Sequence, residues 1–456
     1  METDYAQLAN AGMTPELLAE TFLENHFGGA EPEYPVNPFK ILRDCGVVFS
    51  FRPFEKYEGL YIPAEGEDDI PVVGINLNRP ITRQRYTAAH ELCHHLKDAR
   101  SGVVCPIGSR SKIERYAEKF AACLLMPRTA MARQIDLRGK NGCVTPDGVL
   151  QIADFFGVSF AACVNRVAFD FHALKGYSTA NDVKRLKKSF GPDAKRRRLG
   201  MTDAVMYRQL LDSVEDIIQI EMNPSKRQRF KANYVYHDSR MEGVTVDQET
   251  ASEIVVDLRI NGSSSRYCDV QNSDLIEVAG LAKAYDFIFD HVSSGERISV
   301  YDAKIFNEKL FSLSPHPEFG GRYRESNTLV MGAKFETMDY RDIPAEFLAA
   351  RKNLDSMLEK ETSMTASEYI EAVVRFHHQL TVLHPFRDGN GRSARGMVNI
   401  LLMHRGFPPA LFVEGMKVRY KNALAIADRT GNCNELFCIY CSQILESFAI
   451  LSDTAM

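Results

Sequence analysis

The sequence predicts a multidomain α+β protein, in which a small sheet and helices come first and a mostly α-helical part follows. Three observations lead to this prediction. The chain has 456 residues, whereas a single domain usually has roughly 100 to 200. Short β-rich runs alternate with turn residues between positions 35 and 85, as is typical of a small sheet. From about residue 201 onward, apolar residues recur mainly at helical spacing.

The composition is that of an ordinary globular protein, with 45% hydrophobic residues, 25% charged residues and a net charge of −5. The net negative charge argues against a protein whose whole surface binds nucleic acid. The N-terminal stretch lacks a basic segment followed by an apolar run, and no apolar run approaches the roughly 18 residues of a membrane span. We therefore expect a cytoplasmic protein without membrane contact.

The ten cysteines are scattered along the chain, which suits reduced thiols better than disulfides. Cys438 and Cys441 form a CxxC within the apolar helical run "NELFCIYCSQILESF". With no second cysteine pair nearby, we interpret them as buried core thiols.

The first domain is expected at residues 1–175. Its sheet comes from "CGVVFSFRPF" and "PVVGINLN", and a helix is predicted over 111–126, where Pro127 ends the helical spacing. The stretch "GVLQIADFFGVSFAACVNRVAF" predicts two helices joined at Gly157, with Ser159 as an N-cap. This outline resembles a helix-turn-helix, but a packed helical pair is favoured because no basic reading helix is present there.

A basic segment marks the boundary between the domains. Residues 176–229 are expected to form a linker and connecting helices, and residues 230–456 the second domain. Within the linker, "KRLKKSFGPDAKRRR" at 184–198 contains eight Lys or Arg and one Asp. A solvated connector is favoured, and phosphate contacts of 184–198 with nucleic acid are the alternative.

The stretch "AAHELCHHL" at 88–96 contains the metal-site motif HExxH. On a helix, His90 and His94 share a face and can both bind Zn²⁺, while Glu91 can take a proton from a metal-bound water. The helix over 111–126 places Glu114 and Glu118 four residues apart on the edge of its apolar face. Either carboxylate is a candidate third ligand.

These residues resemble the ImmA/IrrE family of metallopeptidases, which pairs "HELGH" after a strand with a downstream "ExxAN.FAA.LLMP" helix. The resemblance covers roughly residues 35 to 170. It implies a zincin-like metallopeptidase domain in which His90, His94 and Glu114 bind Zn²⁺ and Glu91 is the catalytic base.

Two residues depart from the family pattern: Cys93 replaces a Gly, and Glu118 replaces an Asn. Glu118 can orient a ligating histidine or compete as a ligand, so Glu114 versus Glu118 stays open. His95 is the alternative histidine ligand, and a surface position is favoured for it. A helix pair that keeps the motif without proteolysis is the alternative for the whole domain.

The stretch "LHPFRDGNGRSAR" at 383–395 predicts an anion site. Gly389, Asn390 and Gly391 lie in a loop that leads into a helix, where backbone N–H groups and the helix dipole favour phosphate. Arg392 and Arg395 lie three residues apart and can bind further phosphate oxygens.

Three other residues of this stretch have predicted roles. Asp388 supplies a hard oxygen ligand for Mg²⁺, and His384 can deprotonate an attacking hydroxyl near neutral pH. Phe386 is expected to bury its ring and anchor the loop.

This arrangement resembles the Fic family, whose motif is HxFx[D/E]GNGRxxR. Every position is present, as His384, Phe386, Asp388, Gly389, Asn390, Gly391, Arg392 and Arg395. The resemblance extends over about 230–445 and includes "GGRYR" at 320–324, near the family's GxYR, and "NTLVMGAKFETMDY" at the position of its target-docking hairpin. It implies a mostly α-helical domain with a β-hairpin flap.

The same resemblance implies an activity, namely transfer of AMP from Mg²⁺-bound ATP to a hydroxyl of a target protein, with pyrophosphate leaving. ATP with Mg²⁺ is therefore the expected ligand, and a target protein the expected partner. Fic relatives often pair, so a homodimer is a further expected state, although the sequence leaves the oligomeric state open.

The stretch "HDSRMEGVTV" at 237–246 resembles the family's inhibitory helix, [S/T]xxxE[G/N], with Glu242 followed by Gly243. Asp238 occupies the position that is usually Ser or Thr. A Glu242 carboxylate paired with Arg395 would take the space that the γ-phosphate needs. A surface glutamate on an ordinary helix is the alternative.

Three hypotheses for the whole protein follow. The favoured one is a protein adenylyltransferase, restrained by Glu242 and fused to a zinc metallopeptidase-like domain. The second is a zinc metallopeptidase that an ATP-binding Fic domain regulates. The third is a regulator that binds DNA through the helix-turn-helix outline and the basic linker. The complete motif around His384 favours the first.

Overall fold

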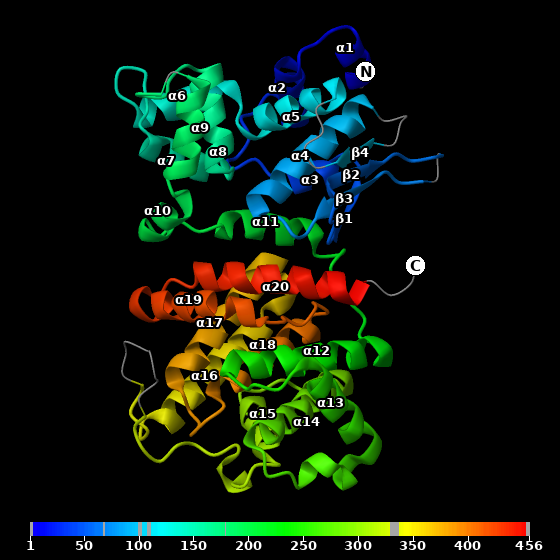
Figure 1. Cartoon of the computed structure of the whole chain (residues 1–456), viewed down its shortest axis with the longest axis vertical. Helices are drawn as coiled ribbons and strands as arrows, with labels where there is room; N and C mark the ends of the chain where they lie inside the picture. Colours follow the sequence, from blue (N-terminus) through cyan, green and yellow to red (C-terminus); the bar gives the residue numbers. More distant parts are fainter. Residues whose placement is uncertain are drawn as a thin grey trace. The chain divides into compact units, whose positions relative to one another are not determined.

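The computed structural model describes residues 3–66, 69–98, 103–106, 111–177, 179–328 and 337–452. It divides into two compact units, Met1–Val214 and Glu215–Met456. Figure 1 labels the helices and strands of both units. The division falls within 176–229, the segment expected to connect the domains. A sheet is present in the first unit, and the described residues of the second unit are mainly helical. The predicted α+β class is thereby confirmed.

The sheet of the first unit has four strands in the order β1-β3-β2-β4. β1 (Val48–Arg52) runs parallel to β3 (Val72–Asn76), and β2 (Tyr57–Ile62) runs antiparallel to β3 and to β4 (Val103–Pro106). Alternate side chains of β1 face the core, where Phe49 and Phe51 are buried.

Helices cover this sheet and pack on one another. α4 contacts β2 and β3 and also packs against α5 (Figure 1). The bounds are α1 (Tyr5–Asn10), α2 (Pro15–His26), α3 (Pro38–Asp44), α4 (Ile81–Lys97), α5 (Lys112–Leu125), α6 (Arg128–Arg138), α7 (Pro146–Phe156), α8 (Phe160–Asn165), the π-helical turn η1 (Arg166–Asp170), α9 (Ala180–Ser189), α10 (Pro192–Arg198) and α11 (Ala204–Val214).

The helix ends of the first unit follow local capping rules. The Ser111 hydroxyl accepts a hydrogen bond from the Glu114 N–H and starts α5. α7 ends at Gly157, which has φ +60°, and α8 starts where Ser159 accepts a bond from the Ala162 N–H. The helix predicted over 111–126 and the two helices joined at Gly157 are present.

The basic segment 184–198 belongs to the first unit, where it forms most of α9 and α10. Val183 and Leu186 of α9 are buried. Lys195 pairs with Asp147, with 2.6 Å between Nζ and Oδ1. This segment therefore packs on the helices before it, although most of its basic side chains stay exposed.

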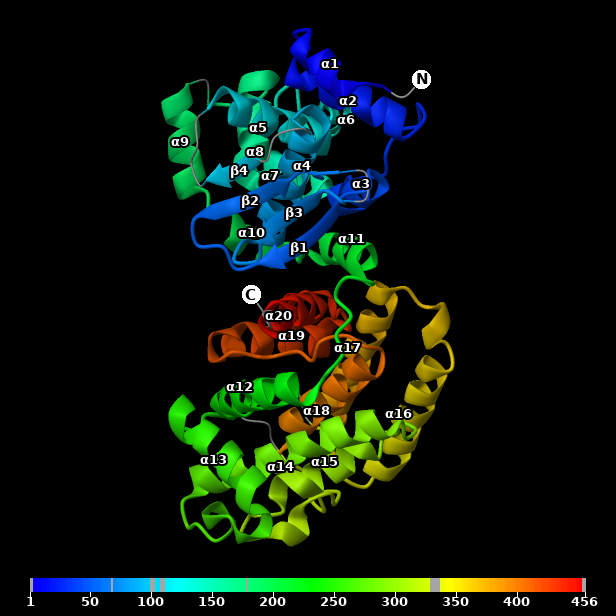
Figure 2. The ribbon, with the colours of Figure 1, turned by 90° about the vertical axis from the view of Figure 1, so that its right-hand side faces the viewer.

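In the second unit, α18 (Asn390–His404) is buried along nearly its whole length. It packs against α14, α15 and α17, as the view in Figure 2 shows. The other bounds are α12 (Pro224–Glu242), α13 (Gln248–Asn261), η2 (Gly262–Ser264), η3 (Arg266–Cys268), α14 (Ser273–Ser294), α15 (Asp302–Phe311), η4 (Pro317–Phe319), α16 (Ile343–Leu358), η5 (Glu361–Ser363), α17 (Ala366–Leu383), η6 (Glu414–Met416), α19 (Lys417–Thr430) and α20 (Asn434–Ser452). The hairpin predicted over 327–340 centres on 329–336, outside the described residues.

Among the described residues, α20 is the one single helix long and apolar enough to cross a membrane, and 72% of its apolar window is buried within the protein. The bent pair Pro146–Phe156 and Phe160–Asp170 meets the same criteria only if it is taken as one span. Cys438 and Cys441 on α20 are fully buried. Their interpretation as core thiols is confirmed.

Arg85 on α4 joins four segments of the first unit. It is fully buried, and its guanidinium donates hydrogen bonds to the Gly157 carbonyl at 3.1 Å, the Val36 carbonyl at 2.6 Å and Gln209 Oε1 at 2.6 Å. Burial lowers the pKa of Arg85 to about 9. Since all three acceptors are neutral, the hydrogen bonds must offset the desolvation of the cation.

We expect Arg85→Met to lower the free energy of unfolding of the first unit by about 3 kcal/mol. Three hydrogen bonds from a charged donor are lost, and the avoided desolvation of the cation offsets only part of that loss. Urea unfolding followed by circular dichroism measures this. Arg133→Ala is the control, since Arg133 forms an exposed ion pair with Glu31 and should cost less than about 1 kcal/mol. Equal loss in both variants would contradict a special role for Arg85.

Candidate active sites

The first site lies where α4 faces α5. His90 and His94 on α4 are 3% and 0% exposed, and their Nε2 atoms lie 3.1 Å apart. Glu114 on α5 reaches both, with 3.1 Å from Oε2 to His90 Nε2 and 3.7 Å from Oε1 to His94 Nε2. One candidate ligand atom from each of the three residues lies within 4.8 Å of the others. The structure thus brings together the three residues that the family resemblance implied.

The other candidate ligands lie differently. Glu118 is one helical turn beyond Glu114 on α5, and its side chain is exposed. His95 Nδ1 lies 3.1 Å from the Tyr61 hydroxyl, so its ring is engaged with the sheet and is not an exposed surface group. The geometry therefore favours Glu114 over Glu118.

The residues present fit a metal ion with a bound water. Burial lowers the pKa of His90 and so favours its neutral, ligating form. Glu91 is fully buried, and neither of its carboxylate oxygens has a hydrogen-bond partner among the described residues. A buried carboxylate without a partner is costly, and a metal-bound water would supply the missing donor.

Two residues that support this site were missed by the sequence analysis. Asp98 Oδ2 lies 3.0 Å from His94 Nδ1, a contact that fixes the ring and leaves Nε2 to face the metal position. The signal was an acidic residue four positions after His94. Gly59 on β2 lies against Glu91, and an added Cβ would overlap the Glu91 carboxylate. This contact joins residues distant in sequence, so no local pattern revealed it.

The second site is built around the loop before α18. α17 ends at Leu383, and His384 caps it with φ +47°, a left-handed conformation that is uncommon outside glycine. Asn390 closes the loop, since its amide donates to the Phe386 carbonyl and accepts from the Phe386 N–H, both at 2.8 Å. Phe386 is buried. Asn390 was predicted to bind nucleotide. Its side chain instead hydrogen-bonds to the Phe386 backbone and stabilises the conformation of the loop.

Arg324 holds the other side of this loop. Its Nε donates to the His384 carbonyl at 2.8 Å, and its N–H donates to the Pro385 carbonyl at 2.9 Å. Burial and the positive charge of Arg324 lower the pKa of His384, so the imidazole is neutral near pH 7 and can accept a proton. The hydrogen bonds from Arg324, the last residue of "GGRYR", to the His384 and Pro385 carbonyls place that segment beside the His384 loop.

The two predicted phosphate-binding arginines are paired with carboxylates. Arg392 Nη1 lies 2.8 Å from Glu277 Oε2, and Arg392 Nη2 lies 3.7 Å from Asp388 Oδ1. The Asp388 side chain is 69% exposed, which leaves it open to solvent. Glu277 was not anticipated, because it lies on α14, more than a hundred residues away.

Arg395 is enclosed by two carboxylates from α12. Its Nε donates to Asp238 Oδ1 at 2.5 Å, and its Nη2 donates to Glu242 Oε1 at 2.6 Å. Burial raises the pKa of Glu242, but Arg395 and Arg392 outweigh that effect and bring it below its ordinary value. A Cβ on Gly391 would lie 3.4 Å from Glu242 Oε1. Glu242 thus lies beside Arg395 and Gly391 at the start of α18, where the sequence predicts an anion site.

Comparisons with known proteins assign a domain to each site. Residues 42–168 match the IrrE N-terminal-like domain, and residues 297–402 match the Fic/DOC family. Protein adenylyltransferase fic-1 from Caenorhabditis elegans is 26% identical over 232 residues, which are 50% of this chain and 43% of that protein. Protein adenylyltransferase Fic from Nematostella vectensis is 29% identical over 182 residues, 39% of each protein.

A solved fragment of Fic-1 from Caenorhabditis elegans is 20% identical to this chain. The match covers 71% of this chain and 92% of that chain, and its TM-score is 0.46. This chain spans less than half of the length of the two curated relatives. The chain carries an IrrE N-terminal-like domain followed by a domain of the Fic/DOC family.

Proposed function

We propose that the protein is an adenylyltransferase that moves AMP from Mg²⁺-bound ATP to a hydroxyl of a target protein. The carrying observation is the loop from His384 to Asn390, which holds a neutral imidazole beside a helix N-terminus with two arginines. The similarity to proteins named protein adenylyltransferase supports the proposal. A phosphate-binding regulator without transfer would not need His384.

Each residue has a distinct task in this reaction. His384 takes the proton from the incoming hydroxyl, whose oxygen attacks the α-phosphorus while the bond to pyrophosphate breaks. The N–H groups around Gly389 and Gly391 and the side chains of Arg392 and Arg395 bind phosphate oxygens. Asp388 is placed to bind the Mg²⁺ that accompanies ATP.

Restraint by Glu242 is part of the proposal. Its carboxylate holds Arg395 and the anion site at the start of α18, which are the groups that would receive the γ-phosphate. Asp238 keeps the Nε side of Arg395 paired. When ATP displaces Glu242, the guanidinium therefore exchanges one anion for another and is never left buried without a partner.

For the first domain, we propose a zinc site formed by His90, His94 and Glu114, with Asp98 orienting His94. Bound Zn²⁺ supplies a Lewis acid and an acidified water. Glu91 is the group that accepts the proton of that water, and Gly59 leaves space for its carboxylate. Peptide hydrolysis is the reaction class that this set of residues serves.

We expect His384→Ala to reduce nucleotide transfer at least about 100-fold with ATP binding largely retained, because the imidazole acts on the hydroxyl and not on the phosphates. The assay follows label from ATP marked at the α-phosphate, and ATP marked at the γ-phosphate must leave the protein unlabelled. Working in a Glu242→Gly background prevents the restraint from masking the result. His404→Ala changes a histidine outside the loop and should keep the activity. Parent-level transfer in His384→Ala would remove His384 from its role.

Glu242→Gly is expected to raise labelling about tenfold or more, which corresponds to roughly 1.4 kcal/mol in the population of competent complexes. Glu242→Gln removes the charge without adding backbone freedom and should act in the same direction. Glu414→Gln removes a neighbouring carboxylate that pairs with Arg240 and should leave the rate unchanged. If Glu242→Gly and the parent label at equal rates at saturating ATP and Mg²⁺, Glu242 is not the restraint.

The first domain should bind one equivalent of Zn²⁺, measured by metal analysis and by competition with a chelator. The double variant His90→Ala and His94→Ala should lose the metal, and Glu114→Gln should bind it more weakly. Asp98→Asn is expected to weaken binding about tenfold. Glu118→Gln is the matched control on the same helix and should keep the metal. Loss of zinc in Glu118→Gln, with retention in Glu114→Gln, would reverse the ligand assignment.

A further inference from the structure

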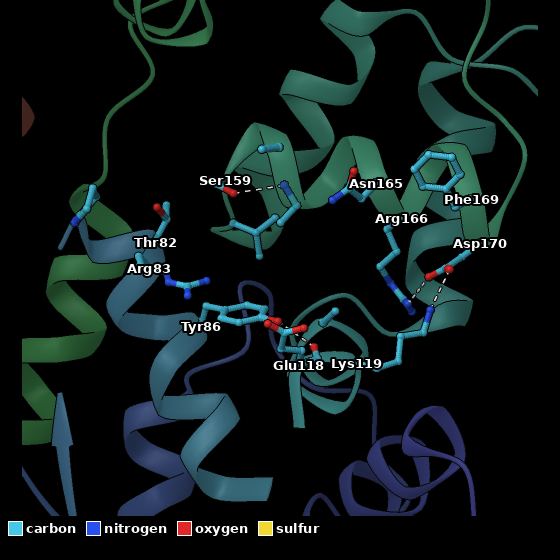
Figure 3. Close-up of a pocket in the computed structure, with 15 residues that line it drawn as sticks. Thr82, Arg83, Tyr86, Glu118, Lys119, Ser159, Asn165, Arg166, Phe169 and Asp170 are labelled. Carbon is cyan, nitrogen blue, oxygen red and sulfur yellow. Dashed lines mark hydrogen bonds and ion pairs between the residues drawn. The ribbon is translucent and has the colours of Figure 1, made fainter. Parts of the chain in front are cut away.

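A cavity of about 680 Å³ lies between α4, α5, α8 and the turn η1 in the first unit. Figure 3 shows its walls, with Arg83 and Tyr86 on one side and Glu118 and Lys119 beneath. Its volume is within the roughly 300 to 1,000 Å³ typical of ligand sites. None of the roles described above uses it.

The cavity adjoins the proposed zinc site. Tyr86 lies one helical turn before His90 on α4, and the centroids of their rings are 6.4 Å apart. Glu118 lies one turn after Glu114 on α5, and its charge acts on His90. A chain segment bound in the cavity would therefore lie beside the proposed metal centre.

Much of the wall formed by α8 and η1 is apolar. Ala161 and Ala162 of α8 line the cavity with small side chains that leave space for a ligand. Val158, just before α8, also lines the cavity and is buried. Phe169 is 45% exposed although its ring is large and apolar. An apolar side chain bound here would remove the Phe169 ring from water, which is favourable.

Each cation that lines the cavity has a carboxylate partner, whereas one of the two carboxylates in the lining has no cation partner among the described residues. Arg166 and Lys119 both pair with Asp170 at 2.8 Å, and Arg83 pairs with Glu58 at 3.2 Å. The exposed carboxylate of Glu118 makes no ion pair or side-chain hydrogen bond with another described residue. The family pattern that this segment resembles has a neutral Asn here, so Glu118 adds a negative charge relative to that pattern.

We propose that this cavity binds a peptide segment that carries a basic side chain next to an apolar one. The apolar side chain packs against Phe169 and the alanines of α8, and the basic side chain pairs with Glu118. That the bound peptide is a substrate rests on the proposed zinc site, whereas the binding itself does not. The charge of Glu118 gives the site its preference for a cation over a neutral or acidic side chain.

The test uses the full chain with Glu91→Gln, so that a peptide is bound and not cleaved. The probes are three fluorescein-labelled hexapeptides of sequence Gly-Ala-Leu-X-Ala-Gly, with X lysine, norleucine or glutamate, followed by fluorescence anisotropy. We expect the lysine peptide to bind about fivefold more tightly than the norleucine peptide, the upper range for an exposed ion pair, and the glutamate peptide to bind most weakly.

Adding Glu118→Gln should abolish the preference for lysine and leave the affinity for norleucine unchanged. Asp136→Asn is the matched control, because it removes an exposed carboxylate of the same unit that does not line the cavity. Ala161→Leu, at an exposed position of α8, should weaken all three peptides by filling the cavity. Its thermal unfolding midpoint and zinc content show whether the fold is kept.

The outcomes separate this inference from the zinc proposal. A preference for lysine that survives Glu118→Gln, or full affinity in Ala161→Leu, would overturn the inference. Bound zinc with no binding of any peptide would overturn it as well and leave the zinc site standing. Peptide binding that depends on Glu118, without zinc, would support the inference and remove the zinc site alone.

Discussion

The second unit depends on the compensation of one buried cation. Arg395, in the second turn of α18, is 3% exposed, and Asp238 of α12, 1% exposed, pairs with it. A buried guanidinium without a partner would cost several kcal/mol, so Arg395 requires at least one of the two α12 carboxylates that reach it, Asp238 or Glu242. The same guanidinium is the proposed phosphate ligand. Stability and nucleotide binding therefore compete for one group, and two carboxylates allow one to leave while the other stays.

Each of the two sites contains a residue in an energetically unfavourable conformation or environment. His384 adopts a left-handed conformation without being glycine, and Glu91 is buried without a hydrogen-bond partner among the described residues. Such features cost stability and persist only where the surroundings enforce them. Arg324 and Asn390 do so for the loop. In the first domain, the cost of burying the Glu91 carboxylate is offset if a bound ligand, such as the proposed metal-bound water, donates the missing hydrogen bond.

Local patterns were enough to predict the helix ends at Pro127 and Gly157, because capping and backbone conformation act over a few residues. The clustering of His90, His94 and Glu114 came from a family resemblance, whereas the choice between Glu114 and Glu118 depends on how α5 rotates against α4. The pairing of Asp238 with Arg395 joins residues 157 positions apart. Periodicity and composition carry no information about such contacts, which is why Glu277, Gly59 and the cavity above α8 were also missed.

The positions where this chain departs from the two family patterns indicate what is particular to it. Asp238 replaces a Ser or Thr and gives Arg395 a second anion, which holds the guanidinium more firmly than a hydroxyl would. Glu118 replaces an Asn and adds a negative charge beside the proposed metal centre, whose candidate ligands are two imidazoles and one carboxylate. Both changes add a carboxylate next to a cation site without replacing one of the residues that act there. In the proposed functions, the residues that match the family patterns carry the chemistry, and the two added charges would adjust what each site binds and how tightly.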